Sequence, residues 1–388
     1  MTKQPDKFLS KPERIMLVGM MLDADYTGAN ETRERAFAAA MAEAEELVRA
    51  TGGELVCRQT AKRDRAHPAL FVGTGKAEEL AQTVRERQIE LAVFNHELTP
   101  TQERNLEKAL QCRVLDRVGL ILAIFAQRAQ SQEGRLQVEL AQLTHLSGRL
   151  VRGYGHLQSQ KGGIGLKGPG ETQLETDRRL IAQKITALKK RLEAVRRQRA
   201  TRRKAREHGS LPTFALVGYT NTGKSSLFNR LTKADVLAKN QLFATLDTTA
   251  RRLYLNPSTS IILTDTVGFV RDLPHGLVAA FSATLEETAL ADVLLHVVDA
   301  AHPEHERQID DVNEVLREIG AGGVPQIVLY NKTDLLPPEE RRFGILRDTR
   351  GRAVAANISV KTGEGLDALR EILAEDAVSD SLKNQNTV

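Results

Sequence analysis

The stretch Gly218-Tyr219-Thr220-Asn221-Thr222-Gly223-Lys224-Ser225 decides the fold of the chain around it, and it has the form G-x-x-x-x-G-K-S. The apolar run at residues 214–217 predicts a buried strand, and residues 226–231 predict the start of a helix. Strand, glycine loop and helix in this order are typical of a phosphate-binding loop. Backbone N–H groups and the positive helix end would hold the phosphates, with Lys224 on the β- and γ-phosphates and Ser225 on Mg²⁺. A chance glycine turn is the alternative interpretation.

A second motif, Asp265-Thr266-Val267-Gly268, ends a later apolar strand. An aspartate in this place can hold Mg²⁺ through water, and the glycine N–H can meet the γ-phosphate. The motif is short and common, so it is informative only together with the phosphate loop upstream.

A third motif, Asn331-Lys332-Thr333-Asp334, also follows an apolar strand and predicts which base is bound. The Asp334 carboxylate would accept hydrogen bonds from N1–H and the exocyclic amine of guanine, whereas adenine presents an acceptor at N1. Lys332 would lie along the base plane, and Asn331 would tie this loop to the phosphate loop. In Ser359-Val360-Lys361, which follows the last strand, a backbone N–H would meet guanine O6. The alternative for N-K-x-D is an ordinary polar turn.

The first part of the chain predicts a mostly parallel α/β sheet, because strand patterns alternate with helical ones. We expect strands at residues 14–18, 54–58, 69–72 and 91–94, and helices at residues 31–50, at 77–88 and from about 100. Gly73-Thr74-Gly75-Lys76 lies within this part. A glycine pair with a lysine could hold phosphate, but the spacing matches neither nucleotide fingerprint, which favours a structural turn.

The middle of the chain predicts two helices joined by a glycine-rich loop. Residues 153–170 contain seven glycines. Apolar residues recur at helical spacing before this loop and at heptad spacing after it. They are Leu136, Leu140, Leu143, Leu146 and Leu150 in the first helix, and Ile181, Ile185, Leu188, Leu192 and Val195 in the second. Two striped helices on either side of one loop indicate a helical hairpin, an antiparallel coiled coil.

The second of these helices is strongly basic. Residues 178–206 contain thirteen lysines and arginines against the single acid Glu193. A solvated helix face is the simpler interpretation. A face this one-sided repels itself unless a polyanion neutralises it, which favours an RNA-binding surface. Aromatic residues are scarce here, so contact with the phosphate backbone is a better expectation than base stacking.

Composition places the chain among globular proteins of two or three domains. It has 388 residues, 41% hydrophobic and 27% charged, with a net charge of +5. Cys57 and Cys112 offer neither a disulfide framework nor a metal site. No apolar run is long enough for a membrane span, and the N-terminus lacks the apolar core of a signal peptide. We expect a monomer in the cytoplasm, with an α/β domain at 1–129, the hairpin at 130–208, a P-loop GTPase domain that carries the three motifs above at 209–376 and a loose tail at 377–388.

The order of the motifs at 218–225, 265–268, 331–334 and 359–361 resembles that of translation-factor-class GTPases. Three further stretches narrow the resemblance, namely residues 168–179, 71–76 and 243–247, with the sequences GPGETQLETDRR, FVGTGK and FATLD. Together they resemble the HflX family of ribosome-associated GTPases, over residues 14 to 375. The motif at 168–179 is specific to that family.

The resemblance implies that the protein binds the large ribosomal subunit, with the hairpin loop approaching ribosomal RNA near the peptidyl-transferase region. It also implies a role in splitting or recycling stalled ribosomes under stress. ATP binding by the N-terminal domain is claimed for members of the family, but no adenine-selective motif stands out in this sequence. Some members carry an extra C-terminal domain, and because this sequence stops soon after its closing helix, we expect any role of that domain to be absent or reduced.

The resemblance adds a further loop to the nucleotide site, Phe243-Ala244-Thr245-Leu246-Asp247. By family position Thr245 is the second hydroxyl on Mg²⁺, which completes a metal set of Ser225, Thr245 and Asp265. Thr248 and Thr249 are alternatives that the sequence leaves open.

Two residues bear on catalysis. Phe269 stands where Ras-like enzymes have a glutamine that orients water, which predicts slow intrinsic hydrolysis and completion of the site by the ribosome. Asn221 occupies the position of an asparagine in potassium-activated GTPases of the Era and TrmE type. It predicts either a K⁺ site beside the phosphates or a residue that only shapes the loop. We therefore expect Lys224, Asn221 and Gly268 to act in catalysis.

The function predicted from the sequence is a GTPase that takes GTP as substrate with Mg²⁺, and that associates with the large ribosomal subunit and its RNA. Two alternatives come from other classes. One is an RNA-binding or ribosome-assembly module that uses GTP as a structural ligand. The other is a small-molecule enzyme acting at Gly73-Thr74-Gly75-Lys76, where no nucleophile or acid–base pair stands out.

Overall fold

The computed structural model describes residues 13–23, 30–153, 169–204, 211–233, 242–243, 245–271, 287–341 and 344–385. The chain forms two compact units. The first comprises Met1–Gln127 and Val138–Arg191, and the second comprises Arg128–Gln137 and Leu192–Val388. The glycine-rich loop from 154 to 168 lies outside the described residues.

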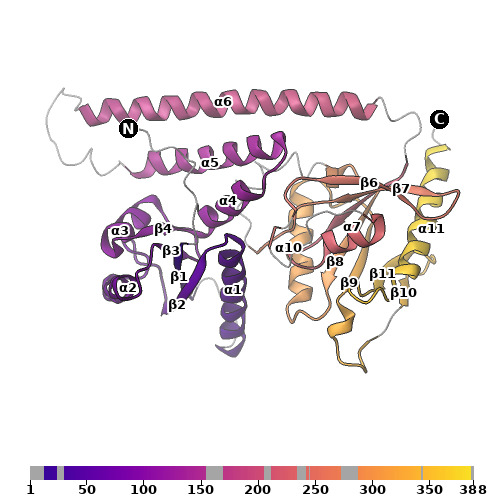
Figure 1. The fold of residues 1–388 in the computed structure, drawn as a ribbon, viewed down its shortest axis with the longest axis horizontal. Helices are drawn as coiled ribbons and strands as arrows, with labels where there is room; N and C mark the ends of the chain where they lie inside the picture. Colours follow the sequence, from indigo (N-terminus) through magenta and orange to yellow (C-terminus); the bar gives the residue numbers. More distant parts are fainter. Residues whose placement is uncertain are drawn as a thin grey trace. The chain divides into compact units, whose positions relative to one another are not determined.

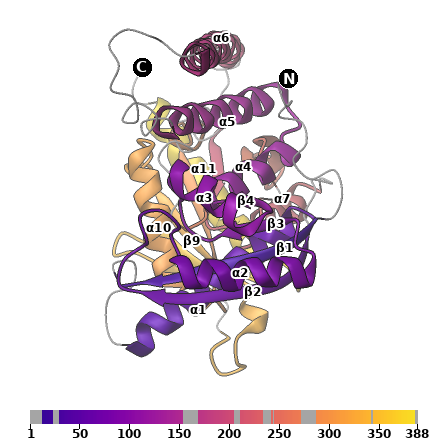
Figure 2. The ribbon, with the colours of Figure 1, turned by 90° about the vertical axis from the view of Figure 1, so that its left-hand side faces the viewer.

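The first unit contains a fully parallel sheet of four strands in the order β2-β1-β3-β4 (Figure 1). The strands are β1 (Arg14–Leu22), β2 (Glu54–Arg63), β3 (Leu91–Phe94) and β4 (Arg113–Leu115), and the helices between and after them are α1 (Asn30–Ala50), α2 (Thr74–Arg87), α3 (Pro100–Leu110) and α4 (Arg117–Arg128). Figure 2 shows α2 lying across the β1–β2 part of this sheet. The parallel α/β organisation predicted from the sequence is confirmed.

One predicted strand is absent, because residues 69–72 turn back on themselves. The N–H groups of Ala69 and Leu70 both donate to His67 Nδ1, and His67 and Phe71 form a short antiparallel bridge. Phe71 has a φ of 59° and is buried at 4% exposure. The apolar run thus packs into the core as a turn, and its hydrophobicity alone does not distinguish a turn from a strand.

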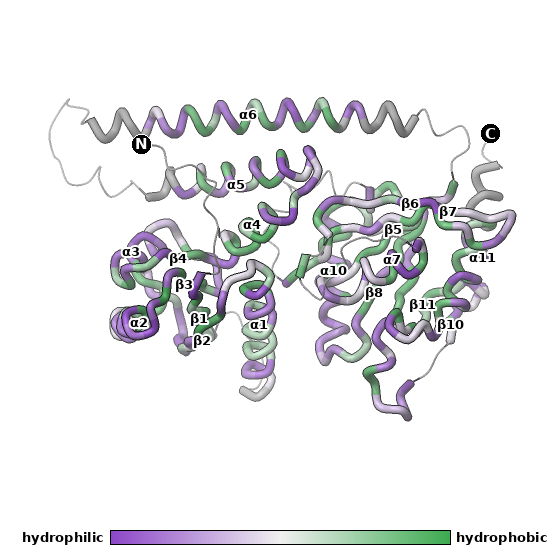
Figure 3. The backbone as a smooth tube through the Cα atoms, viewed as in Figure 1, coloured by the Kyte–Doolittle hydropathy of each residue, from purple (hydrophilic) through white to green (hydrophobic). Residues whose placement is uncertain are grey.

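Two long helices follow, α5 (Gln132–Gly153) and α6 (Pro169–Lys204), and they run in opposite directions (Figure 1). On α6 the predicted seam is the least exposed face, with Leu188 and Leu192 buried. Figure 3 shows this seam as hydrophobic bands along an otherwise hydrophilic helix. On α5 the buried positions include Val138, Leu140 and Ala141, whereas Leu146 is 45% exposed.

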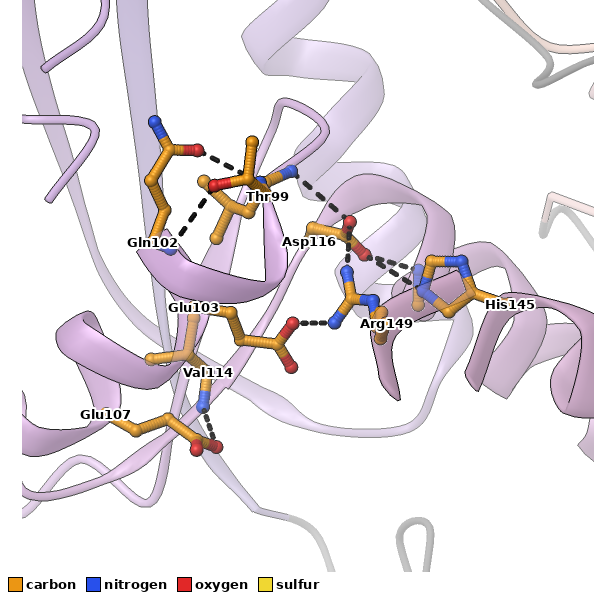
Figure 4. Close-up of polar contacts among 10 residues, drawn as sticks. Thr99, Gln102, Glu103, Glu107, Val114, Asp116, His145 and Arg149 are labelled. Atoms are coloured by element: carbon orange, nitrogen blue, oxygen red, sulfur yellow. Dashed lines mark hydrogen bonds and ion pairs between the residues drawn. The ribbon is translucent and has the colours of Figure 1, made fainter. Parts of the chain in front are cut away.

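A buried polar cluster attaches α5 within the first unit (Figure 4). Asp116, which is 0% exposed, accepts hydrogen bonds from the backbone N–H groups of Leu98 and Gly119. Arg149 of α5 donates to Asp116 Oδ2 at 2.6 Å and pairs with Glu103 of α3. A buried carboxylate is stable only when it is paired and hydrogen-bonded, so this cluster ties α5 to the ends of β4 and α3.

The second unit is built on a seven-stranded sheet in the order β10-β11-β9-β8-β5-β7-β6. The five central strands are parallel, and the two edge strands are antiparallel to their neighbours. The strands are β5 (Thr213–Val217), β6 (Thr249–Tyr254), β7 (Ser260–Asp265), β8 (Val293–Asp299), β9 (Gln326–Asn331), β10 (Gly344–Arg347) and β11 (Ala353–Asn357), and the helices are α7 (Lys224–Thr232), α10 (His305–Glu318) and α11 (Leu366–Gln385). This arrangement gives the predicted mixed α/β fold with parallel strands around a P-loop.

The core of this unit explains the apolar runs in the sequence. The inward side chains of β5, β7 and β8 are buried at 4% exposure or less, and Leu227 and Phe228 of α7 pack against them. Helix α11 continues to Gln385, where the sequence predicted a loose tail from 377, and Ala377 is buried at 2% exposure. Within the described residues, every helix is too short or too polar to cross a membrane.

Candidate functional site

The loop of residues 218–225 connects β5 to α7, as the motif predicts. Two of its glycines are required by close approach. Gly218 has a φ of 142°, and a Cβ there would lie 2.2 Å from the Val297 carbonyl oxygen. Gly223 has a φ of 99°, and a Cβ there would lie 2.4 Å from Asn331 Nδ2. Larger residues would force the loop away from the adjacent strand ends.

Lys224 is held inside this loop. Its Nζ donates to the carbonyl oxygens of Gly218 (3.0 Å) and Tyr219 (2.6 Å), and the residue is 6% exposed. Burial lowers the pKa of Lys224 to about 8, and the nearby carboxylate of Asp265 partly opposes this shift. A buried ammonium group that lacks a full countercharge favours an anion beside it, which suits a phosphate.

Three oxygen-bearing side chains meet at the start of α7. Ser225 Oγ lies 2.7 Å from Thr245 Oγ1, and both hydroxyls donate to Asp265 Oδ2, at 2.7 and 2.8 Å. Asp265 is 0% exposed, and its Oδ1 is buried without a hydrogen-bond partner. Burial raises the pKa of this carboxyl, and the two hydroxyl donors oppose the shift. Such hard oxygen donors fit Mg²⁺, which is bound through one or two carboxylates, hydroxyls and water.

Thr245 thus lies in contact with Ser225 and Asp265, the other two residues of the predicted metal set. Thr249, one of the alternatives, begins β6 and is paired in register with Asp265.

The motif at 265–268 lies directly against the phosphate loop. Gly268 packs so closely that a Cβ there would be 2.8 Å from Thr220 Cγ2 and 3.1 Å from Lys224 Nζ. Phe269 pairs through its backbone, since its N–H donates to the Gly218 carbonyl and its carbonyl accepts from the Thr220 N–H. Its ring is 1% exposed. The position that carries a water-orienting glutamine in Ras-like enzymes is therefore occupied here by a core side chain.

The loops that carry the motifs at 331–334 and 359–361 converge at the ends of β9 and β11. Asn331 donates through Nδ2 to the Thr222 carbonyl at 2.7 Å and accepts from the Val360 N–H at 3.0 Å, which is the predicted tie to the phosphate loop. Asp334 Oδ1 accepts from the Ser359 hydroxyl at 2.7 Å. Lys332 Nζ pairs with Asp299 Oδ2 at 2.7 Å. Carboxylate, amide and lysine are thus each fixed by hydrogen bonds or an ion pair within the protein.

These loops enclose one open pocket of about 760 Å³ in the second unit. Predicted site residues that line it are Thr220, Asn221, Gly223, Lys224, Ser225, Phe243, Thr245, Thr266, Gly268, Asn331, Lys332, Asp334, Val360 and Lys361. Six further predicted site residues do not line the pocket but form hydrogen bonds with neighbouring residues. They are Gly218, Tyr219, Thr222, Asp265, Thr333 and Ser359. Leu246 and Val267 are buried, at 3% and 6% exposure. Ala244 lies outside the described residues.

Several residues of the pocket were missed from the sequence. Ser226, Asn229 and Arg230 line it from α7, at the helical spacing that follows the phosphate loop. Leu335 lines it just after Asp334. Asp299, which ends the apolar strand β8 as Asp265 ends β7, could have been found by the same criterion.

Asp247, which was predicted to contact the nucleotide, does not line the pocket. Asp247 is directed to residues 130 and 131, where its carboxylate accepts three hydrogen bonds.

The glycine pair at residues 73 and 75 shows no phosphate cradle. Gly73 precedes α2 with a φ of 90°, and Lys76 Nζ is paired with Glu79 at 2.7 Å and Gln59 at 3.2 Å. A lysine already bonded to a carboxylate supports the structural turn that the sequence favoured.

Comparison with known families shows matches along most of the chain. Three family models match in succession, described as GTP-binding GTPase N-terminal at residues 38–126, GTP-binding GTPase Middle Region at 128–206 and 50S ribosome-binding GTPase at 213–332. The third covers the phosphate loop, the 265–268 motif and the first two residues of the 331–334 motif.

Individual relatives are more closely similar. GTPase HflX of Escherichia coli (strain K12) is 52% identical over 333 residues, which cover 86% of this chain and 78% of that protein. GTPase HflX of Magnetococcus marinus is 52% identical over 319 residues, covering 82% and 73%. The chain belongs to the HflX family of GTPases. Its resemblance to that family, seen first in the motifs at 71–76, 168–179 and 243–247, is confirmed.

A solved structure supports the fold of this HflX-family chain. The crystal structure of a protein named SsGBP, titled as a complex with GDP, matches with a TM-score of 0.51 and 24% identity. The match covers 95% of this chain and 99% of that one. Both units therefore have counterparts in one known chain.

Proposed function

We propose that this HflX-family protein binds GTP with Mg²⁺ and hydrolyses it when the large ribosomal subunit completes its active site, in the splitting, recycling or rescue of ribosomes under stress. The observation that carries the proposal is the meeting of Ser225, Thr245 and Asp265 beside Lys224, in a pocket whose other end holds Asp334. This arrangement supports the proposal, because the residues that would contact phosphate, Mg²⁺ and guanine follow the order in which Mg²⁺-GTP presents these groups.

Each part of the pocket has a role in this proposal. The N–H groups of residues 218–225 and the Lys224 ammonium would hold the β- and γ-phosphates. Ser225, Thr245 and Asp265 would hold Mg²⁺, which neutralises charge on the phosphate oxygens. Asp334, backed by Ser359, would accept from guanine, and Lys332, fixed by Asp299, would cover the base.

The hydrolytic machinery is incomplete in this proposal. Phe269 is buried and cannot polarise water, so the attacking water must be oriented by another group. Asn221, the fourth residue of the phosphate loop, lines the pocket with a φ of 61°, and its amide oxygen would be the group that faces a monovalent cation. K⁺ there would stabilise charge in the transition state, as an arginine finger does.

The partner is proposed from charge and from the family description. Seven of the thirteen cations of the basic run are described, and all seven are exposed on α6, namely Arg178, Arg179, Lys184, Lys189, Lys190, Arg191 and Arg197. A cationic face of this kind suits the phosphate backbone of ribosomal RNA. A monomer with domain boundaries near residues 129, 208 and 376 is part of the same proposal.

Turnover of GTP with and without isolated large subunits tests the proposal. We expect slow turnover by the free protein and stimulation of at least about 100-fold by large subunits, the scale on which completing a GTPase site acts. Equal turnover in both conditions would support the alternative, a ribosome-assembly module that holds GTP as a structural ligand. Repeating the assay in KCl and NaCl at equal ionic strength separates a K⁺ site at Asn221 from a loop-shaping residue.

A further inference from the structure

The carboxylate of Asp247 binds the segment that leads into α5. Its Oδ2 accepts the backbone N–H groups of Gln130 (2.8 Å) and Ser131 (2.7 Å), and its Oδ1 accepts the Ser131 hydroxyl at 2.5 Å. Both partners belong to the second unit. Three hydrogen bonds to one carboxylate make a strong, directional contact between Ser131 and Asp247, which are 116 positions apart in the sequence.

Residues 130 and 131, which donate to Asp247, are themselves held by the first turn of α5. Ser131 Oγ accepts the backbone N–H of Gly134 at 2.8 Å, and the Ser131 carbonyl accepts the N–H of Arg135. Ser131 therefore caps the helix while it donates its hydroxyl proton to Asp247. A carboxylate placed before the first turn of a helix is also favoured by the helix dipole. The contact is thus fixed from the helix side.

Gly134 leaves the space that the carboxylate occupies. A Cβ built on Gly134 would lie 2.2 Å from Asp247 Oδ1 and 3.1 Å from Ser131 Oγ. The glycine has ordinary helical backbone, so its requirement comes from this close approach rather than from a special φ. Any larger side chain at 134 would displace the Asp247 carboxylate.

Asp247 stands two residues after Thr245, whose hydroxyl lies 2.8 Å from Asp265 and 2.7 Å from Ser225. Leu246 between them is buried at 3% exposure. A loop fixed at both ends of a three-residue span has little freedom left in the middle. Holding Asp247 therefore holds the Thr245 hydroxyl where the metal site needs it.

We propose that Ser131 and Gly134, at the start of α5 and outside the matched GTPase region at 213–332, are positioning residues of the nucleotide site. They act through Asp247 on Thr245, so part of the metal site is assembled by the middle region of the chain. This inference rests on the proposed function, because it concerns the Mg²⁺-GTP complex. Loss of the contact should weaken the triphosphate complex selectively, since loops of this kind are ordered by the γ-phosphate and metal and released in the diphosphate state.

The test compares two glycine substitutions in the same helix. Gly134→Ala places its methyl group against Asp247, whereas Gly148→Ala meets no heavy atom within 4 Å. We expect Gly134→Ala to lower the affinity for a non-hydrolysable GTP analogue about tenfold, equivalent to about 1.4 kcal/mol, and to raise the Mg²⁺ concentration needed for half-maximal binding. GDP affinity should stay within about twofold, and Gly148→Ala should match the wild type in all three measurements.

Substitutions of Asp247 provide a second measurement. Asp247→Asn retains an oxygen for the two backbone donors, so it should lose less analogue affinity than Asp247→Ala. Equal analogue affinity for Gly134→Ala and Gly148→Ala would overturn the inference, as would parallel losses of GTP-analogue and GDP affinity. Failure of the wild type to bind the analogue with Mg²⁺ would instead overturn the proposed function itself.

Discussion

At the scale of single residues, the Asp334 carboxylate is the group through which the proposed function selects guanine over adenine. Ser359, itself 0% exposed, donates to Asp334 Oδ1 at 2.7 Å and so fixes the rotamer of the carboxylate. A carboxylate fixed in this way binds a base that presents two donors more tightly than a base that presents an acceptor, because a buried mismatch leaves polar groups unpaired.

Replacing this carboxylate by an amide should change the base preference. In Asp334→Asn we expect the affinity for GTP to fall about 100-fold, the scale of losing a hydrogen bond to a charged group. Xanthosine triphosphate should gain affinity in the same variant, because the amide N–H₂ donates to the xanthine carbonyl. Fluorescent-nucleotide titration measures both. Unchanged GTP affinity in a variant that still binds nucleotide would show that Asp334 does not contact the base.

His296 is a residue whose burial makes the second unit sensitive to acid. It lies in β8 between Val217 of β5 and Val328 of β9, at 1% exposure. Burial lowers the pKa of His296 to about 4, from an ordinary value of 6.5. Between pH 4 and pH 6.5 the imidazole of His296 is therefore protonated in the unfolded chain but neutral in the folded chain. The contribution of His296 to the unfolding free energy is complete above pH 6.5 and is lost as the pH falls toward 4.

A variant without this imidazole should be less sensitive to pH. Between pH 7.5 and pH 5 the wild type should lose about 2 kcal/mol of unfolding free energy through His296, at 1.36 kcal/mol per pKa unit. His296→Leu should be free of this loss while sharing the losses due to carboxylates. Urea unfolding at the two pH values measures the difference. A parallel pH dependence for both proteins would contradict the assignment.

At the scale of elements, the cluster around Asp116 fixes where α5 attaches to the first unit (Figure 4). Arg149 brings the positive charge, and the backbone N–H groups of Leu98 and Gly119 complete the shell. His145, one turn before Arg149, places Nε2 4.0 Å from Asp116 Oδ1. The helix is therefore anchored by charge near its far end as well as by apolar burial at Val138 and Ala141.

Removing the arginine should cost far more than removing an exposed one. Arg149→Met leaves Asp116 buried without its main countercharge, so we expect a loss of about 3–5 kcal/mol in unfolding free energy. Arg135→Met, at an exposed position of the same helix, should cost less than about 0.5 kcal/mol. Adding Asp116→Asn to Arg149→Met should recover part of the loss, as measured by chemical unfolding. Equal losses for the two arginine variants would disprove the anchor.

Elements with a strong local pattern could be predicted from sequence, and contacts between distant segments could not. Strands β5, β7 and β9 are apolar runs that lead directly into the motifs at 218–225, 265–268 and 331–334, so periodicity and motif agreed. Strand β10 is four residues at a sheet edge with one partly buried side chain, which leaves almost no pattern. The contact of Asp247 with Ser131 joins the last residue of the 243–247 motif to a serine that belongs to no motif, and only the fold brings them together.

At the scale of the whole molecule, charge is concentrated on one helix. The basic run belongs to α6, and within the described part of the run the cationic side chains are all exposed. Arg197 also pairs with Glu193, the single acid of the run. A concentrated positive field of this kind increases affinity for a polyanion and makes that affinity depend on salt.

Charge reversal on α6 should therefore uncouple the protein from ribosomes while nucleotide binding is retained. For the triple variant Lys184→Glu, Lys189→Glu, Arg191→Glu we expect at least about tenfold weaker cosedimentation with large subunits and a shallower dependence on salt. The matched control Lys62→Glu, Arg85→Glu, Lys108→Glu reverses three exposed charges of the first unit. Equal cosedimentation of the two variants would contradict an RNA-binding role for α6.

The position of β5 at the centre of its sheet also has a consequence for biosynthesis. Strand β5 is synthesised first. Strands β6 and β7 follow it and form one side of the sheet, and β8, β9 and β11 come later and form the other side. Until β11 emerges, β9 is an open edge with unpaired backbone groups, and such edges promote aggregation. Residues 359–361 follow β11, so the base end of the pocket is completed last. Nucleotide can then act as a late folding ligand, which stabilises the sheet once its final strand has paired.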